Sequence, residues 1–369
     1  MVYKSPMPSL CYKSLLLILA CTFISDPAHA QVTDFDDKAA VIFTYMGIGD
    51  DDMAISADKF KEQMDELSEG GYSVTSLETV ITAFEENKPL PARTVVITFD
   101  GADKSVYETA LPILKAKNFP FTVFLPADSI SADKPPYLSW DQIEDIGTNS
   151  GTFGIHPASY AGMIGLSDEE IRRQINNSVA EVREKLGVEA KFLAYPFGEY
   201  DANAKKIAKD MGFKAAFGQA SGVAYSGDDR FALPRFTITE RYGDIDRFKM
   251  TANALPLPVT DISPADPHLS SLTPAIGFTV NDALKKSLKG LSCFSSVEER
   301  PKLEILNARV ELRLEKPFDD DRPRINCTLP VVGEKGAEPR WRWLGMLYTV
   351  DEPALSPAAQ AGSDAYSVE

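Results

Sequence analysis

An α/β fold with a parallel sheet, followed by a smaller β-rich part, is the fold class that this sequence predicts. Between Val41 and Arg247, apolar runs of strand length alternate with helical patterns, which is typical of a parallel sheet covered by helices. Beyond Pro274, apolar and polar residues alternate with a period of two, as in the strands of an antiparallel sandwich. Recurring prolines with little periodicity separate the two parts.

The elements of the first part follow from apolar spacing and from start and stop signals such as Ser56 before a helix and a glycine after it. The predicted strands are 40–49, 94–100, 120–126, 151–156, 190–198 and 215–219, and the predicted helices are 56–72, 106–119, 139–147, 167–187 and 202–213. In the second part, the predicted strands lie within 302–316, 322–332 and 340–350.

The 369 residues are enough for two domains. We predict an α/β domain over 31–254, a Pro-rich linker over 255–274, a β-rich C-terminal module over 275–352 and a disordered tail over 353–369. The formal net charge of -16 argues against nucleic acid as a partner, because binding phosphates requires a concentrated basic surface.

Residues 1–30 have the pattern of a signal peptide. Lys4 and Lys13 precede a short apolar run, and "AHA" ends at Ala30, where cleavage would leave Gln31 first. An alternative is a lipoprotein signal with Cys21 at the cleavage point. The run is too short for a membrane helix and no later segment qualifies, so we predict a periplasmic or secreted protein without a transmembrane segment.

Two cysteines, Cys293 and Cys327, remain after the predicted signal peptide. An even number of cysteines in an exported protein predicts one disulfide, which would staple the C-terminal module. Two buried free thiols are the alternative.

Four stretches fall at the ends of predicted strands: "TYMGIGDDD", "TFDGADKS", "GIHPASY" and "AYPFGEYD". In parallel α/β folds the active face lies at the carboxyl ends of the strands, so these stretches are the candidate site. Over about residues 40 to 240, their order and spacing resemble the polysaccharide deacetylases of the NodB type, carbohydrate esterase family 4. The resemblance implies a distorted parallel (β/α) barrel that removes N-acetyl groups from a polysaccharide.

The chemistry of that family explains its residue types. A divalent metal such as zinc lowers the pKa of bound water and polarises the acetyl carbonyl, and an aspartate accepts the proton of the water. By resemblance, Asp100 is the catalytic base and His156 is a metal ligand.

The sequence departs from the family at several positions. Gly101 replaces the metal-binding aspartate, Tyr160 replaces the second histidine, Met46 stands where a histidine is common, and Ala194 replaces an arginine. In "ALPRFTI", no Leu-x-His supplies a general acid. The resemblance therefore implies a divalent metal that is weakly bound or absent.

Asp103 is a possible replacement ligand beside His156. A simpler interpretation is that Asp100 and Asp103 cap the following helix. His156 would then be a hydrogen-bonded histidine at a strand end.

Aromatic rings stack on the apolar faces of sugars, so the resemblance also implies a saccharide groove. Its predicted lining is Tyr45, Tyr160, Tyr195, Pro196, Phe197 and Gly198. In the C-terminal module, Trp341 and Trp343 share one strand face, where they form either a sugar platform or, as we favour, part of the sandwich core.

Three functions remain open. The first is metal-assisted hydrolysis of N-acetyl groups on an envelope or secreted polysaccharide. The second is a catalytically inactive relative, a pseudoenzyme that binds a polysaccharide, an oligosaccharide or a partner enzyme. The third is a structural envelope protein whose C-terminal module docks to a protein partner.

Overall fold

The computed structural model describes residues 1–2, 34–133, 135–331 and 339–350. The predicted signal peptide, beyond its first two residues, and the predicted tail from residue 353 lie outside the described residues. Within the described ranges, every helix is too short or too polar to cross a membrane.

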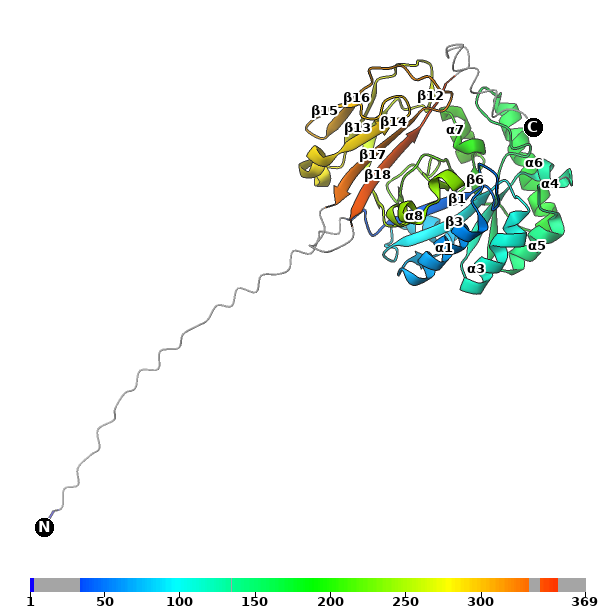
Figure 1. The fold of residues 1–369 in the computed structure, drawn as a ribbon, viewed down its shortest axis with the longest axis horizontal. Helices are drawn as coiled ribbons and strands as arrows, with labels where there is room; N and C mark the ends of the chain where they lie inside the picture. The colour runs from blue at the N-terminus through cyan, green and yellow to red at the C-terminus, as the bar shows by residue number, and fades with distance from the viewer. Residues whose placement is uncertain (3–33, 134, 332–338, 351–369) are drawn as a thin grey trace.

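A curved sheet of nine strands forms the centre of the α/β part (Figure 1). Its main path runs in the order β7, β6, β5, β4, β3, β1, β8, and all neighbours on it are parallel except β1 and β8. The strands of this path are β1 (Ala39–Tyr45), β3 (Thr94–Asp100), β4 (Phe121–Leu125), β5 (Gly151–Ile155), β6 (Phe192–Ala194), β7 (Ala215–Phe217) and β8 (Ala224–Tyr225). Off the path, β2 (Ser73–Val74) pairs with β3, and β9 (Phe236–Ile238) pairs with β1. This curled, mainly parallel sheet confirms the predicted fold class.

Helices follow the strands and cover the outer face of the sheet (Figure 1). The α-helices are α1 (Ala57–Glu69), α2 (Leu77–Glu85), α3 (Leu111–Lys117), α4 (Ala127–Ser131), α5 (Trp140–Thr148), α6 (Asp168–Leu186), α7 (Ala202–Asp210) and α8 (Ile245–Ala252), and the other helical segments are η1 (Val106–Ala110), η2 (Pro196–Gly198), η3 (Glu240–Tyr242) and η4 (Asp282–Gly290). The sequence did not predict α2, α4 or α8. Ser139 and Ser167 cap their helices through side-chain hydrogen bonds, whereas Ser56 precedes α1 without one.

The period of two along each strand separates two faces of the sheet. On β3, Val95 and Ile97 belong to the core beneath the outer helices, whereas Val96 belongs to a second core inside the curve. The next inward positions on this strand are Thr98 and Asp100, both fully buried. The inward-facing side chains of β3 are therefore apolar near its amino end and polar at its carboxyl end.

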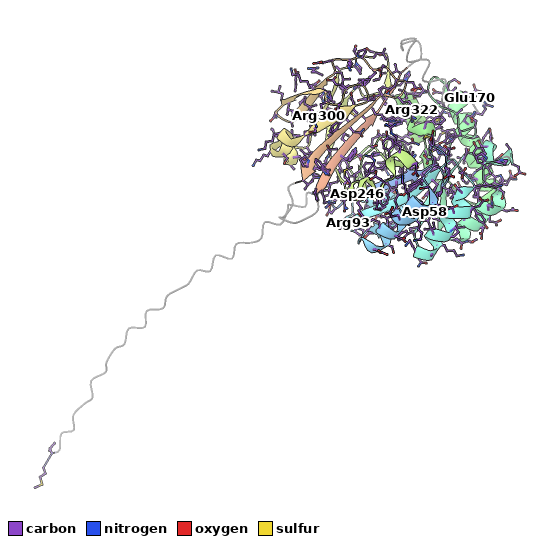
Figure 2. The ribbon with its side chains drawn as sticks, in the orientation of Figure 1. Asp58, Arg93, Glu170, Asp246, Arg300 and Arg322 are labelled. Carbon is purple, nitrogen blue, oxygen red and sulfur yellow. A yellow bond between two sulfur atoms is a disulfide. The ribbon has the colours of Figure 1, made fainter. Side chains whose placement is uncertain are left out.

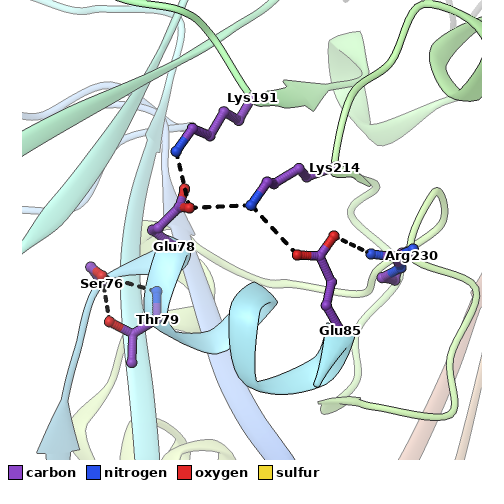
Figure 3. A network of polar contacts seen from close by, with 7 residues as sticks. All are labelled: Ser76, Glu78, Thr79, Glu85, Lys191, Lys214 and Arg230. Atoms are coloured by element: carbon purple, nitrogen blue, oxygen red, sulfur yellow. Dashed lines mark hydrogen bonds and ion pairs between the residues drawn. The ribbon is translucent and has the colours of Figure 1, made fainter. Parts of the chain in front are cut away.

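Helix α2 packs on the inner core, and an ion-pair network fixes it at the amino ends of β6 and β7 (Figure 3). Glu78 binds Lys191, with 3.0 Å between Oε1 and Nζ, and also Lys214. Glu85 binds Lys214 and Arg230. Exposed pairs contribute little individually, so we assign this network a role in positioning α2.

Two further sheets make up the β-rich part (Figure 1). One has the order β10 (Leu255–Pro256), β18 (Arg340–Leu347), β17 (Arg324–Val331), β14 (Ser292–Ser295), and the other has the order β11 (Val259–Ser263), β13 (Ile276–Val280), β16 (Arg309–Arg313), β15 (Lys302–Leu306). Their buried residues form one shared core, as in a sandwich. A separate pair joins β12 (His268–Leu269) to β19 (Thr349–Val350). Cys293 and Cys327 face each other on β14 and β17 and form the predicted disulfide.

The segment 255–274 is not the irregular linker that its prolines predict. It contributes β10, β11 and β12, each paired with a later strand. Strands β10 and β11 lie at the edges of their sheets, where proline is tolerated because one side of the strand needs no ladder hydrogen bonds. The domain boundaries stay a prediction.

Trp343 joins the two parts of the chain. Its ring belongs to the outer core of the α/β part and meets Phe236 edge-on, with 5.3 Å between ring centroids. Its indole N–H donates to Asn326 Oδ1 over 3.2 Å. On the neighbouring position, Arg342 binds the Asp36 carboxylate through both guanidinium ends. The prediction that Trp343 lies in the sandwich core was wrong, because its strand face is turned toward the α/β part.

We expect Trp343→Ala to lower the free energy of unfolding by about 3 to 5 kcal/mol, the usual cost of removing a buried large aromatic side chain. Trp341→Ala, at a half-buried position of the same strand, is the matched control and should cost less. Urea unfolding of both variants measures the difference. Equal costs would contradict a core shared by the two parts.

Candidate functional site

A buried ion pair occupies the carboxyl end of the barrel. Asp100 ends β3, and Arg235 directly precedes β9. The guanidinium donates from Nη1 to Asp100 Oδ1 and from Nη2 to Oδ2, each over 2.7 Å. Both side chains are fully buried. A bidentate pair of this kind fixes the orientation of the carboxylate.

Further hydrogen bonds complete the pair. Arg235 Nε donates to the carbonyl of Gly218 over 3.0 Å, and Nη1 also lies 3.2 Å from the hydroxyls of Thr44 and Thr98. Gln219 Nε2 donates to Asp100 Oδ2 over 3.3 Å. The charges are thus surrounded by polar partners, as buried charges must be.

The pKa of Asp100 reflects this environment. Burial by itself raises the pKa, but the interactions with Arg235 and His156 together outweigh burial and hold the pKa well below its usual range. A general base works best with a pKa near the operating pH. In this arrangement Asp100 is a charged partner of Arg235 at neutral pH and a weak proton acceptor.

His156 lies within ion-pair range of Asp100 but forms no hydrogen bond with it. Its Nε2 is 3.6 Å from Asp100 Oδ1, beyond hydrogen-bond distance. The ring is fully buried, and within the described chain neither ring nitrogen has a hydrogen-bond partner. The prediction of a hydrogen-bonded histidine at a strand end is therefore wrong. Buried polar atoms without partners are rare in folded proteins, so this imidazole is the unusual feature of the site.

Aromatic rings continue from His156 toward the surface. Tyr160 contacts His156 edge-on with 4.6 Å between ring centroids, and Phe197 contacts Tyr160 at 5.2 Å. The Tyr160 hydroxyl is buried without a partner in the described part, and burial raises the pKa of this phenol. Phe197 is 40% exposed, so it offers a ring face to solvent.

The "PFG" turn presents Phe197 through an unusual backbone. Phe197 and Gly198 have φ values of 56° and 76°, both in the left-handed region. A Cβ on Gly198 would lie 2.4 Å from the backbone nitrogen of Gln219, so only glycine fits there. Pro196 is buried at the start of the turn. The turn that follows β6 therefore places the Phe197 ring at the surface.

Tyr45 and Tyr195 do not line the cleft, contrary to the prediction. Both are fully buried. The Tyr45 hydroxyl donates to Gln63 Oε1 over 2.8 Å, and the Tyr195 hydroxyl donates to the carbonyl of Phe231 over 2.9 Å. Both rings belong to the core beneath the outer helices, and on β1 Tyr45 shares that face with Phe43.

Asp103 caps the chain locally. Its Oδ1 accepts from the backbone N–H of Ser105 over 2.8 Å and from the Ser105 hydroxyl. That hydroxyl also accepts from the N–H of Ile48 over 2.8 Å. Asp103 therefore forms a local turn just before η1, whereas Asp100 binds Arg235 and does not cap the helix.

The donors present do not fit a catalytic zinc ion. Such an ion normally has three protein ligands, and a phenol is a poor ligand unless ionised. Throughout the described ranges, no group of three or more His, Cys, Asp or Glu side chains is placed to hold a metal ion. A divalent cation at Asp100 would also be repelled by the Arg235 guanidinium.

Arg235 is the site residue that sequence reasoning missed. The absence of an arginine at position 194 was visible in the sequence, but Arg235 enters from a different strand. The only signal was a charged residue directly before the apolar run "FTI". Recognising it required knowing that β9 pairs with β1, two strands that are far apart in sequence.

The β-rich part also reaches the site. Arg322, just before β17, donates from Nη2 to the carbonyl of Phe197 over 2.6 Å and forms an ion pair with Glu199. Figure 2 labels Arg322 where the C-terminal sheets meet the α/β part. This contact holds the turn that carries the exposed ring.

Comparison with known proteins identifies the α/β part. Residues 87–216 match the family model described as polysaccharide deacetylase. This region belongs to the polysaccharide deacetylase family. The deacetylase-family region also has the fold of IcaB from Ammonifex degensii, with a TM-score of 0.53 and 24% identity over 58% of this chain and 96% of that one. A Streptococcus pyogenes deacetylase, PplD, gives a TM-score of 0.53 and 21% identity over 55% and 94%.

Two curated relatives align with the same region. The poly-beta-1,6-N-acetyl-D-glucosamine N-deacetylase of Escherichia coli (strain K12) is 25% identical over 227 residues. The putative polysaccharide deacetylase YxkH of Bacillus subtilis (strain 168) is 22% identical over 182 residues. The matches cover 50% and 49% of this chain, but only 34% and 64% of those proteins. The chain thus spans about a third of the length of the E. coli protein and less than two thirds of the length of the B. subtilis protein.

We expect Asp100→Asn to lower the free energy of unfolding by about 3 to 5 kcal/mol, because it leaves the Arg235 charge buried and unpaired. Asp103→Asn keeps a capping oxygen and should cost less than about 1 kcal/mol. Adding Arg235→Met to Asp100→Asn should recover part of the loss. A full loss in the double variant would contradict the pairing argument.

The same pair predicts a pH dependence. A depressed pKa contributes stability that is present above the unfolded value of about 4 and is lost as the pH falls below it. Between pH 5 and pH 2, chemical unfolding should therefore show a steeper loss of stability in the wild type than in Asp100→Asn. Parallel curves would show that Asp100 carries no such linkage.

Proposed function

We propose that the chain binds an N-acetylated glucosamine polysaccharide at the carboxyl end of the barrel and does not hydrolyse it. The observation that carries this proposal is the donor set around Asp100: one imidazole, a phenol that burial keeps protonated, and an arginine on both carboxylate oxygens. Such a set does not produce the metal-bound nucleophile that amide hydrolysis by this family needs.

Binding uses the groups that remain. The exposed face of Phe197 can stack on the apolar face of a sugar ring, while Tyr160 supports Phe197 from behind. Arg322 fixes the backbone of the turn, so the ring is preorganised. The E. coli relative is named for β-1,6-linked N-acetylglucosamine, and we propose the same polymer class for this chain.

The proposed location is outside the cytoplasm. Residues 1–30 have the composition of a signal peptide, and a disulfide joins Cys293 and Cys327. Disulfides persist in oxidising compartments, where an exported polysaccharide would also be found.

Phe197→Ala should weaken binding of poly-N-acetylglucosamine roughly 3- to 10-fold, the range of a single aromatic stacking contact. Phe294→Ala, which removes another exposed ring on β14, should leave affinity unchanged. Affinity is measured by calorimetry with and without chelator, and acetate release is assayed in parallel. Acetate release that stops with chelator would overturn the non-hydrolytic proposal.

Hydrolysis is the second candidate function, and one observation favours it. Both nitrogens of His156 are buried without partners in the described part, as in a ligand that lacks its ion. Asp103 would then have to leave Ser105 to join it.

Zinc titration separates the candidates. We expect the purified chain and His156→Ala to bind equally little zinc, because a single imidazole does not supply the three protein ligands that a catalytic zinc ion normally has. His268→Ala, which changes a histidine on β12, is the control. One zinc ion per chain, lost in His156→Ala and kept in His268→Ala, would instead support the enzyme.

A further inference from the structure

A cavity of about 370 Å³ lies between the α/β part and the C-terminal sheets. This volume is within the range of small-molecule sites, about 300 to 1,000 Å³. The residues that matter below are Tyr200, Tyr225, Asp228, Asp229, Lys205 and Trp343, all in its lining. The exposed strand β11 also lines the cavity.

Aromatic side chains give this cavity surfaces for a ring. Tyr200 stacks on the buried Tyr195, with 4.7 Å between centroids, which fixes its orientation. Tyr225 is half-buried and packs over Gly227. Among the described residues, neither the Tyr200 nor the Tyr225 hydroxyl has a hydrogen-bond partner, and neither is sealed from solvent. Both hydroxyls can therefore bond to a ligand.

The charge of the cavity is unbalanced. Asp229 binds Lys205, with 3.0 Å between Oδ2 and Nζ. Asp228 accepts the backbone N–H of Tyr225 over 3.0 Å and has no lysine, arginine or histidine partner in the described chain. Asp261 adds a third carboxylate to the lining. Burial, helped by the charge of Asp229, raises the pKa of Asp228 to about 7, which is the behaviour of a carboxylate that lacks a cation.

We propose that this cavity binds a cationic amino sugar, that is, a glucosamine unit without its N-acetyl group, with the ammonium group on Asp228 and the ring against Tyr200 or Tyr225. The site is distinct from the one at Phe197 and does not depend on whether the chain hydrolyses anything.

The chemistry favours this ligand over two others. An N-acetylated sugar is neutral and would leave Asp228 without a countercharge. A divalent metal needs several oxygen or nitrogen donors, and the described residues place no such group here. An ammonium sugar needs one carboxylate, hydroxyl partners and an aromatic face, which are the groups present.

The test compares glucosamine tetramer with N-acetylglucosamine tetramer by calorimetry on the purified chain. We expect the cationic tetramer to bind more tightly to this site and Asp228→Asn to weaken it about tenfold or more, the effect of losing a charged hydrogen bond. Asp58→Asn removes the same charge from an exposed position on α1 and should change nothing.

A fluorescence measurement locates the ligand independently. The chain has three tryptophans, and Trp140→Phe with Trp341→Phe leaves Trp343 alone in the cavity wall. Glucosamine tetramer should change its emission, and Phe294→Ala, which changes an exposed ring outside the cavity lining, should not affect that change. The proposal is wrong if Trp343 emission is unaffected, or if Asp228→Asn binds the cationic tetramer as well as the wild type does. Failure of the Phe197 site would leave this result untouched.

Discussion

The buried Asp100–Arg235 pair is the constraint on which the rest of the site depends. It joins β3 to the start of β9 on either side of β1, and its hydrogen bonds reach Thr44, Thr98 and Gly218. Removing either charge alone would leave the other buried without compensation, so each of the two charges requires the other. The same pairing lowers the proton affinity of the carboxylate. The contact with Arg235 therefore both fixes the Asp100 carboxylate in the fold and makes it a weak base.

The polar end of the barrel follows from the alternation of side chains along its strands. Every second residue of β3 faces inward, and that row changes from Val96 to Thr98 and Asp100 toward the carboxyl end. The amino end is filled by the apolar face of α2. A polar row in a low-dielectric interior is stable only when each group is bonded. His156, whose ring nitrogens lack partners in the described part, is the exception.

Much of the fold could be predicted from the sequence, but the site could be predicted only in part. Apolar periodicity is local, so the strands of the parallel sheet and the helices that follow most of them were visible in it. Asp100, His156, Tyr160 and Phe197 lie close together because all four follow strand ends. The pairing of Arg235 with Asp100 and the burial of Tyr45 and Tyr195 depend on how the strands and helices pack together. A local sequence pattern does not contain that information. Proline marked 255–274 as irregular because its use in edge strands depends on sheet position.

The β-rich part is better understood as a wall of the proposed binding region than as an appended module. Trp343 lies in the core of the α/β part, Arg342 binds Asp36, and Arg322 holds the carbonyl of Phe197. Each contact joins segments far apart in sequence, and together they fix the two parts against each other at several points. A module that only docked elsewhere would not need to share a core with the barrel. A wall that shapes one site and encloses a second cavity would need that rigidity, because binding is tightest when the groups that meet the ligand are already in place.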